Sequence, residues 1–218
     1  MKIKVCGMRD ASNLNDVARL GTDMTGFIFY KGSPRYVKQG DALGNFHEFE
    51  VELDPPPLRV GVFVNASEEE VLEETAAHRL DYVQLHGDES PGYCASIQGF
   101  VPVIKAFRVG PDFDLGGCEA YQQACDLFLF DAKGLRYGGN GTKFDWGILA
   151  DYQGPTPFLL SGGIGPEDVE AIAAFEHPFL EGIDLNSGFE LSPGDKNVAS
   201  LRGFVNRIRS MHEKLSAI

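Results

Sequence analysis

The sequence has no apolar run that approaches the roughly 18–20 residues needed to span a bilayer. Its opening residues, 1–7, lack the apolar core of a secretory signal peptide. Its four cysteines form no CxxC pair, the spacing found in many zinc and redox motifs. We therefore expect a cytoplasmic protein with free thiols. The matches to the glycosylation pattern at Asn65 and Asn140 have no role without a secretory route.

Positive charge is scarce, with 19 Lys and Arg against 32 Asp and Glu, which gives a formal net charge of −13. Such a field repels polyphosphate and excludes general binding to nucleic acid or to an anionic membrane. A small anionic substrate stays compatible, because a few backbone amides and one arginine can bind a phosphate inside an acidic protein. The 43% hydrophobic content is globular, and 218 residues suit one domain or a small barrel over 1–218.

Short apolar runs alternate with helical stretches along the whole chain. Most runs are continuously apolar, as expected of strands that are covered on both faces. We count eight, at 3–7, 24–30, 59–64, 82–87, 103–109, 127–132, 158–162 and 182–186. Eight β/α units in this length predict an α/β fold, a single-domain (β/α)8 TIM barrel. The alternative is a doubly wound sheet, which usually has five or six strands and a glycine fingerprint that is missing here.

Helix signals stand between the runs. Ser67 followed by Glu70 forms a capping-box start, and Gly165-Pro166 places proline in a first turn. Residues 197–215 carry apolar residues near helical spacing, whereas the stretch 42–50 is the weakest helix. The glycine-rich stretch 137–141 is read either as a mobile loop over the site or as a plain connection.

Cys6 stands where the first predicted strand ends, and Gly7 leaves the approach to its thiol open. Alternation along the strand puts Lys4 and Cys6 on one face, with Ile3 and Val5 on the other. A thiol at a barrel rim can act as a base or nucleophile if a nearby cation or helix end lowers its pKa. The alternative is a small buried hydrophobic residue, the usual role of a free cysteine.

Asp131 follows three apolar residues at the end of the sixth run. A carboxylate is costly in an apolar core, so we expect it at the rim with a partner. Such a carboxyl group is a candidate general acid, and the alternative is a cap of the loop that follows. The first and sixth strands are not neighbours, so Cys6 and Asp131 are expected to face each other across the barrel mouth. One base and one acid suit a proton-moving isomerisation.

Glycines follow both the seventh and the eighth runs, as Gly162-Gly163 in one loop and Asn186-Ser187-Gly188 in the other. The loops after strands seven and eight are the usual phosphate site of such barrels, where backbone N–H groups and a short helix N-terminus bind the anion. We therefore predict a phosphate site here, although tight turns also need glycine.

Further polar residues stand at or near the strand ends. Arg35, after the second run, suits a bidentate contact with a substrate carboxylate, or else is a solvated surface arginine. His86 ends the fourth run, and a lone histidine is more often a hydrogen-bonded structural residue than a catalyst; no paired ligand supports a metal site. Asp184 and Asn186 are two residues apart, so they have the same parity: their side chains point to the same face of the strand, and Asp184 should face the mouth. Lys105 is expected inside the barrel, paired with a carboxylate.

The motifs occur in a specific order along the chain. They are KVCG at 4–7, GFIF at 26–29 with SPRY at 33–36, VGVFVN at 60–65, VQLHG at 83–87, Asp131 before FDW at 144–146, SGG at 161–163 and DLNSGFE at 184–190. Each is modest alone, but together they resemble the phosphoribosylanthranilate isomerase family of tryptophan biosynthesis, over about residues 3–197. The resemblance implies a TIM barrel that carries out an Amadori rearrangement of N-(5-phosphoribosyl)anthranilate with no metal and no cofactor.

The resemblance also implies roles for the candidate residues. Asp131 would be the general acid at the furanose ring oxygen, and Cys6, as thiolate, the general base at C2 of the sugar. Arg35 would hold the anthranilate carboxylate and Asp184 would lie near the bridging amine. The other implied substrate contacts are His86 and, around the phosphate, Gly162, Gly163, Asn186, Ser187 and Gly188.

This sequence departs from the family pattern at two positions, because many relatives carry Ser at Asn186 and Asp at Asn197. The first can still act through its backbone N–H, and the second leaves the role of the last loop open. The expected partner is a small phosphorylated substrate, with a monomer or a homodimer as the assembly.

Three other readings keep the same barrel. A sugar-phosphate epimerase would need His and Asp clustered at the strand ends for a metal, and we find none in the sequence. An indole-forming synthase would need a Lys and Glu set at matching strand ends. A non-catalytic phosphate-binding barrel predicts loss of the acid or the base, whereas both Cys6 and Asp131 are present.

Overall fold

Eight parallel strands close into a barrel in the computed structural model, and each strand pairs with the next in chain order until β8 pairs with β1. The strands are β1 (Lys2–Val5), β2 (Met24–Ile28), β3 (Leu58–Phe63), β4 (Tyr82–Leu85), β5 (Val103–Val109), β6 (Leu127–Ala132), β7 (Phe158–Leu160) and β8 (Leu180–Leu185). The (β/α)8 prediction is therefore confirmed, and the doubly wound alternative is wrong. Each expected strand is present, with ends that differ by up to two residues.

The structure describes residues 1–37, 53, 55–134 and 143–216. The expected weak helix at 42–50 and the glycine-rich stretch at 137–141 lie outside these residues. Among the described helices, none combines the length and the apolar character that a bilayer crossing requires.

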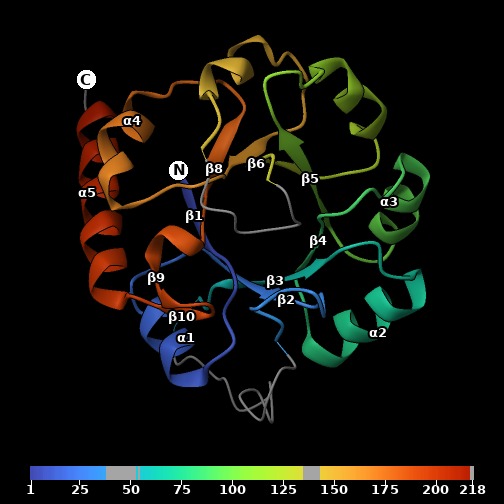
Figure 1. Cartoon of the computed structure of the whole chain (residues 1–218), viewed down its shortest axis with the longest axis horizontal. Helices are drawn as coiled ribbons and strands as arrows, with labels where there is room; N and C mark the ends of the chain where they lie inside the picture. The colour runs from blue at the N-terminus through green and yellow to red at the C-terminus, as the bar shows by residue number, and fades with distance from the viewer. Residues whose placement is uncertain (38–52, 54, 135–142, 217–218) are drawn as a thin grey trace.

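Helices form a ring around the strands, with α5 packed against both α4 and α1 (Figure 1). The α-helices are α1 (Ala11–Ala18), α2 (Glu68–His78), α3 (Pro91–Gln98), α4 (Val169–Ala174) and α5 (Val198–Ser216). Short 3-10 helices are η3 (Leu115–Tyr121), η4 (Trp146–Asp151), η5 (Pro166–Asp168) and η6 (Ser187–Phe189). Thus 3-10 turns, rather than α-helices, are described after β5 and after β6.

Two of the three predicted helix starts are confirmed by capping hydrogen bonds, whereas Pro166 begins the 3-10 helix η5, which leads into α4. The Ser67 hydroxyl accepts from the backbone N–H of Glu70 at 3.2 Å and caps α2. Asn197 caps α5 by accepting from Ser200 N at 3.1 Å. These bonds satisfy N–H groups that a helix leaves without partners in its first turn.

The core has two layers that follow the parity of the strand residues. The inner layer fills the barrel with Met24, Val60, Ile104, Ala106, Leu127, Leu129 and Leu159. Residues of opposite parity, such as Phe128 and Phe130, pack outward into the larger cluster under the helices. Positions that continue the inner parity beyond this layer therefore point into the barrel mouth, where the strands end.

A two-stranded hairpin that the sequence analysis did not predict follows β8. It consists of β9 (Glu190–Ser192) and β10 (Asp195–Lys196), which pair antiparallel. The hairpin lies near α1 (Figure 1), and Asn13 of α1 is hydrogen-bonded to the Lys196 backbone in both directions, at 2.9 Å each. It adds side chains to the mouth of the barrel from outside the eight strands.

Candidate active site

Cys6 lies directly after β1 with the inner parity that the sequence predicts. Ile3 and Val5 belong to the outer cluster, whereas Cys6 packs with Ile28 and Val62. The residue is 3% exposed, and its backbone N–H donates to Leu185 O at 2.8 Å. The structure therefore places the thiol in the mouth, covered by its neighbours.

A glycine on β2 makes room for this thiol. A Cβ built on Gly26 would lie 2.7 Å from Cys6 Sγ, too close for any larger residue. Gly7 has φ +80°, a left-handed conformation that glycine adopts without strain. Gly7 thus lets the chain turn after Cys6, and Gly26 lets the sulfur pack against β2.

Charges surround the sulfur. Lys4 Nζ donates to Asp184 Oδ1 at 2.8 Å, and Lys4 lies on the same inner face as Cys6, two residues before it. Burial raises the pKa of the Cys6 thiol above its ordinary value; Asp184 adds to the rise, and Lys4 and Lys196 oppose it. Asp184 is 6% exposed and has Ser161 Oγ at 3.5 Å. It faces the mouth as predicted, with its carboxylate held by Lys4.

Asp131 is the second-last residue of β6, and it continues the parity of Leu127 and Leu129 into the mouth. Its Oδ1 accepts from Ala132 N at 2.9 Å, and its Oδ2 lies 3.2 Å from His86 Nε2. The expected partner of this carboxylate is therefore His86, which follows β4. The Asp131 side chain is 15% exposed, so solvent or a ligand can reach it.

Cys6 and Asp131 occupy equivalent places on two strands that are not adjacent. In the closed barrel β1 pairs with β2 and β8, and β6 pairs with β5 and β7. Both side chains point inward at the carboxyl ends of their strands. The arrangement puts a thiol and a carboxyl group on separate walls of one opening, as the sequence analysis expects.

Arg35 is 7% exposed, so the expected alternative of a solvated surface arginine is wrong. Its Nε and Nη2 donate to the Glu190 carboxylate at 2.6–3.0 Å, from the loop after β2 to the start of β9. An arginine has five N–H donors, so among the described residues the guanidinium keeps N–H groups for a further acceptor. Glu190 holds it in place at the mouth.

The glycine loops after β7 and β8 lie side by side. Gly162 and Gly163 have φ +91° and +67°, and a Cβ on Gly162 would lie 2.6 Å from Ala132 N at the end of β6. A Cβ on Gly188 would collide with the carbonyl oxygen of Ile164. Only glycine allows these approaches. The structure thus brings together the loops that the sequence analysis assigns to a phosphate site.

The loop after β8 carries Asn186 and Ser187 into η6. Asn186 Oδ1 accepts from Lys196 Nζ at 2.7 Å, so its side chain is held by the β9–β10 hairpin. Ser187 begins the 3-10 turn that Gly188 continues. The backbone N–H groups of this turn adjoin the loop after β7.

Three charged residues of the site were not assigned roles from the sequence: Lys4, Glu190 and Lys196. Lys4 carries a usable signal, because a lysine with inner parity on a buried strand needs a polar partner. Glu190 and Lys196 carry none, because their positions depend on how the hairpin folds.

Lys105 corrects one expectation. Its Nζ lies 3.0 Å from Glu89 Oε2, so the predicted pairing with a carboxylate is confirmed. However, it shares the parity of Val103 and Phe107, which pack into the outer cluster, and therefore lies outside the barrel. Its Nζ also donates to the carbonyls of Leu85 and Gly87. Lys105 thus holds the loop that carries His86. It is not part of a Lys and Glu set at the strand ends, which an indole-forming synthase would need.

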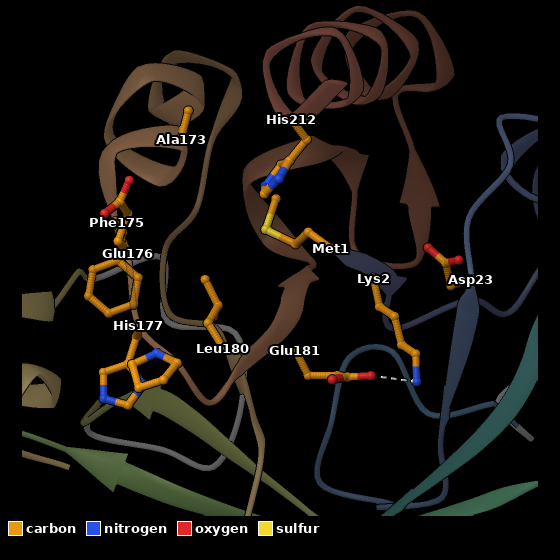
Figure 2. A pocket seen from close by; sticks show the side chains of 11 residues that line it. Met1, Lys2, Asp23, Ala173, Phe175, Glu176, His177, Leu180, Glu181 and His212 are labelled. Carbon is orange, nitrogen blue, oxygen red and sulfur yellow. Dashed lines mark ion pairs between the residues drawn. The ribbon is translucent and has the colours of Figure 1, made fainter. Parts of the chain in front are cut away.

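A pocket of about 1010 Å³ lies at the opposite end of the barrel. Figure 2 shows Met1 and His212 side by side and Lys2 paired with Glu181 at 2.7 Å. Its walls come from the first residues of β1 and β8 and from the α4 region, away from the strand ends that carry Cys6 and Asp131. Within the described residues, no group of three or more His, Cys, Asp or Glu side chains is arranged to hold a metal ion.

Comparison with known proteins gives the same picture over nearly the whole chain. The family model for N-(5'phosphoribosyl)anthranilate (PRA) isomerase matches residues 3–207. The N-(5'-phosphoribosyl)anthranilate isomerase of Parabacteroides distasonis is 47% identical over 210 residues, covering 95% of this chain and 93% of that protein.

Two solved structures share the fold with similar coverage. Monomers of the dimeric phosphoribosylanthranilate isomerase of Thermotoga maritima superpose with a TM-score of 0.81 at 31% identity, over 96% of this chain and 99% of that one. A phosphoribosyl anthranilate isomerase in complex with reduced 1-(o-carboxyphenylamino)-1-deoxyribulose 5-phosphate gives the same TM-score, identity and coverage. The chain belongs to the N-(5'-phosphoribosyl)anthranilate isomerase family and is an isomerase of tryptophan biosynthesis.

Proposed function

We propose that the chain catalyses the Amadori rearrangement of N-(5-phosphoribosyl)anthranilate to 1-(2-carboxyphenylamino)-1-deoxyribulose 5-phosphate. One observation carries the assignment of residues to this reaction. A thiol, Cys6, and a carboxyl group, Asp131, point into one barrel mouth from separate walls, beside two abutting glycine loops. A base, an acid and a phosphate site are the parts that this isomerisation needs.

Asp131 acts as the general acid in the first step. Its carboxyl proton passes to the furanose ring oxygen, the C1–O bond breaks, and the nitrogen lone pair forms a C1=N iminium. The 15% exposure of the Asp131 side chain gives a substrate access to this carboxyl group. His86, at 3.2 Å, orients it and contacts the substrate from the same wall.

Cys6 acts as the general base in the second step. Its thiolate takes the proton from C2, the C–H electrons form the C1–C2 double bond, and the iminium nitrogen becomes neutral. The enolamine then gains a proton at C1 and loses one from the C2 hydroxyl to give the ketone. Burial raises the pKa of the free thiol, and a cationic iminium beside it favours the thiolate. Because the iminium is an electron sink, this chemistry needs no metal and no cofactor.

The remaining site residues bind the substrate. The free N–H groups of Arg35 take the anthranilate carboxylate, and Asp184 faces the bridging amine. The phosphate is held by backbone N–H groups of the Gly162-Gly163 and Asn186-Ser187-Gly188 loops. We further infer that the enzyme works in the cytoplasm, where its four free cysteines stay reduced, as a monomer or a homodimer.

A turnover assay tests the proposal. Phosphoribosylanthranilate is made in place from anthranilate and phosphoribosyl pyrophosphate by a helper transferase, and loss of its fluorescence is followed in buffer with EDTA. We expect loss well above the spontaneous rate. Cys6→Ala and Asp131→Asn should each lower kcat by about 10²–10⁴-fold, the usual contribution of a general acid or base.

Matched substitutions separate chemistry from folding. Cys118→Ala removes a buried thiol on η3, and Asp112→Asn neutralises an exposed carboxylate after β5; both should keep kcat within about twofold. Near-full activity of Cys6→Ala would overturn the base assignment, and near-full activity of Asp131→Asn the acid assignment. No turnover by a folded wild-type protein would overturn the reaction itself.

A further inference from the structure

Two buried ammonium groups lie near Cys6, and neither has a part in the proton transfers above. Lys4, from β1, is fully buried and lies on the same inner face of the chain as Cys6, two residues before it. Lys196, from β10, is 1% exposed. A Cβ built on Gly7, the residue after Cys6, would lie 3.5 Å from Lys196 Nζ. The second ammonium group therefore sits over the backbone that carries the thiol.

The partners of these lysines leave a positive charge in excess. Asp184 compensates Lys4 at 2.8 Å. Glu190 is shared, because its carboxylate binds Lys196 Nζ at 2.6 Å and Arg35 Nη2 at 2.6 Å. Among these described groups, three cations thus face two carboxylates. Buried charge without a counter-charge is costly, so this cluster favours one more anion.

Two anions can meet this need: the substrate carboxylate that is proposed to bind Arg35, and the thiolate of Cys6. The groups that face the Cys6 sulfur are Lys4 on its own strand, Asp184 on β8 and Lys196 on β10, while Arg35 reaches the same Gly7 position, with its Cδ 2.8 Å from a Cβ built there. We propose that Lys4 and Lys196 are positioning residues that lower the cost of ionising the Cys6 thiol in its buried place. This inference rests on the proposed role of Cys6 as the base.

The directions of the pKa shifts agree with this geometry. Burial raises the pKa of Cys6, and the charges of Lys4 and Lys196 pull it back down. Burial lowers the pKa of Lys196 below its ordinary value, and the charge and hydrogen bond of Glu190 oppose that change. When the thiolate takes the C2 proton, an S–H bond forms, the C2–H bond breaks, and both lysines keep their own protons.

Lys196 offers a cleaner test than Lys4. Removing Lys4 would leave Asp184 as a buried carboxylate without its cation, which threatens folding. After Lys196→Met, Glu190 keeps its paired contact with Arg35, so the carboxylate stays compensated. Lys196→Arg keeps the positive charge. Glu190→Gln removes a negative charge, whereas Lys196→Met removes a positive one.

The experiment measures the ionisation of Cys6 directly. Thiolate absorbance near 240 nm is followed against pH for each variant, and the same titration in a Cys6→Ala background is subtracted to remove the other thiols and the tyrosines. Lys196→Met should move the midpoint upward by about one pH unit, a tenfold loss of thiolate at a fixed pH below it. Lys196→Arg should restore the wild-type midpoint, and Glu190→Gln should move it downward.

The pH profile of kcat/KM in the turnover assay should shift with the same sign, which a purely structural role of Lys196 would not produce. An unchanged midpoint in folded Lys196→Met would overturn the inference. If that variant fails to fold, the downward shift in Glu190→Gln decides instead, and its absence overturns the inference.

The outcome is separable from that of the proposed function. If Cys6→Ala stays active, Cys6 is not the base, yet the thiol titration still tests whether the lysines favour its ionisation. If Cys6→Ala is inactive and Lys196→Met leaves the midpoint of the thiol titration unchanged, Cys6 remains the proposed base and the positioning role of Lys196 is wrong.

Discussion

His86 Nε2 lies 3.2 Å from Asp131 Oδ2, which joins the end of β4 to the end of β6 across β5. On its other side, His86 Nδ1 lies 2.7 Å from the Gln84 amide Nε2. A Gln84 amide that donates to Nδ1 selects the tautomer with the proton on Nε2, the ring nitrogen nearest the carboxylate. The ring thus has a defined orientation and a donor aimed at the proposed acid.

Removing this donor should slow the reaction. His86→Leu removes the Nε2 group that lies 3.2 Å from Asp131 Oδ2 and has no hydrogen-bond partner in the described structure, so it is available to the carboxylate that remains after proton transfer. A hydrogen bond to a charged group contributes about 1.5–3 kcal/mol, so we expect kcat to fall by about 10–100-fold. His86→Gln, which can place an amide N–H in the same direction, should lose less. Equal steady-state kcat values for His86→Leu and wild type would contradict the orienting role.

Arg35→Ala should weaken substrate binding, with KM raised by about tenfold or more because a charge-assisted pair is lost. An analogue made from aniline, which lacks the carboxylate, makes the test specific. Wild type should bind this analogue worse than the anthranilate substrate, whereas Arg35→Ala should bind both alike. A wild-type enzyme that does not distinguish the two compounds would show that Arg35 binds another group.

Gly188→Ala should disturb the proposed phosphate site, because the added Cβ collides with the Ile164 carbonyl in the neighbouring loop. We expect KM to rise and the free energy of unfolding to fall by about 1–3 kcal/mol, the usual cost of overpacking. Gly203→Ala on α5 is the control, since a Cβ there meets no atom within 4 Å. The free energy of unfolding of this control, measured in urea, should rise by about 0.5–1 kcal/mol, because alanine has a higher helix propensity than glycine.

Two lysines predict a contrast in stability. Lys105 pairs with Glu89 where both side chains are at most 3% exposed, and Lys105→Met should cost about 3 kcal/mol by leaving a buried carboxylate uncompensated. Lys143, whose side chain is 43% exposed, pairs with Asp168 at 2.7 Å, and Lys143→Met should cost about 1 kcal/mol or less. Chemical denaturation of both variants checks the difference, and equal losses would refute the structural role given to Lys105.

Glu190 predicts a pH effect on stability. Burial acts to raise its pKa, but the hydrogen bonds and charges of Arg35 and Lys196 outweigh burial, so the pKa lies below its ordinary value. A lowered folded-state pKa stabilises the fold above the unfolded value of about 4.3, and that stability is lost as pH falls through the folded-state pKa. The melting temperature of Glu190→Gln should therefore fall less steeply than that of the wild type as the pH is lowered below about 4. Parallel curves would contradict the shift.

Parity explains why much of the site could be predicted. Lys4 and Cys6 alternate with Ile3 and Val5, so the face of β1 that enters the mouth follows from the pattern alone. In a barrel of parallel strands every carboxyl end lies at one rim, so candidate residues from distant positions gather there. His86, by contrast, fits both a functional and a structural interpretation in the sequence, because its partner Asp131 comes from another strand.

Lys105 shows where the pattern was misjudged. Its neighbours of equal parity, Val103 and Phe107, pack outward, and the carboxylate that meets it comes from Glu89 in the loop before α3. A lysine within an apolar run shows that a partner is needed, but not which element supplies it. The side of the sheet on which it lies is settled by where that partner is.

The sequence by itself determined the barrel, the inward parity of Cys6 and Asp131, and the glycine loops after β7 and β8. These features depend on local alternation and turn chemistry, which the order of residues states directly. Only the tertiary structure decided that Glu190 holds Arg35 from a position 155 residues away, and that Lys196 lies over Gly7 beside the thiol. Such contacts form because barrel closure brings β8 to β1 and folds the following hairpin over the mouth, where paired charges satisfy one another out of water.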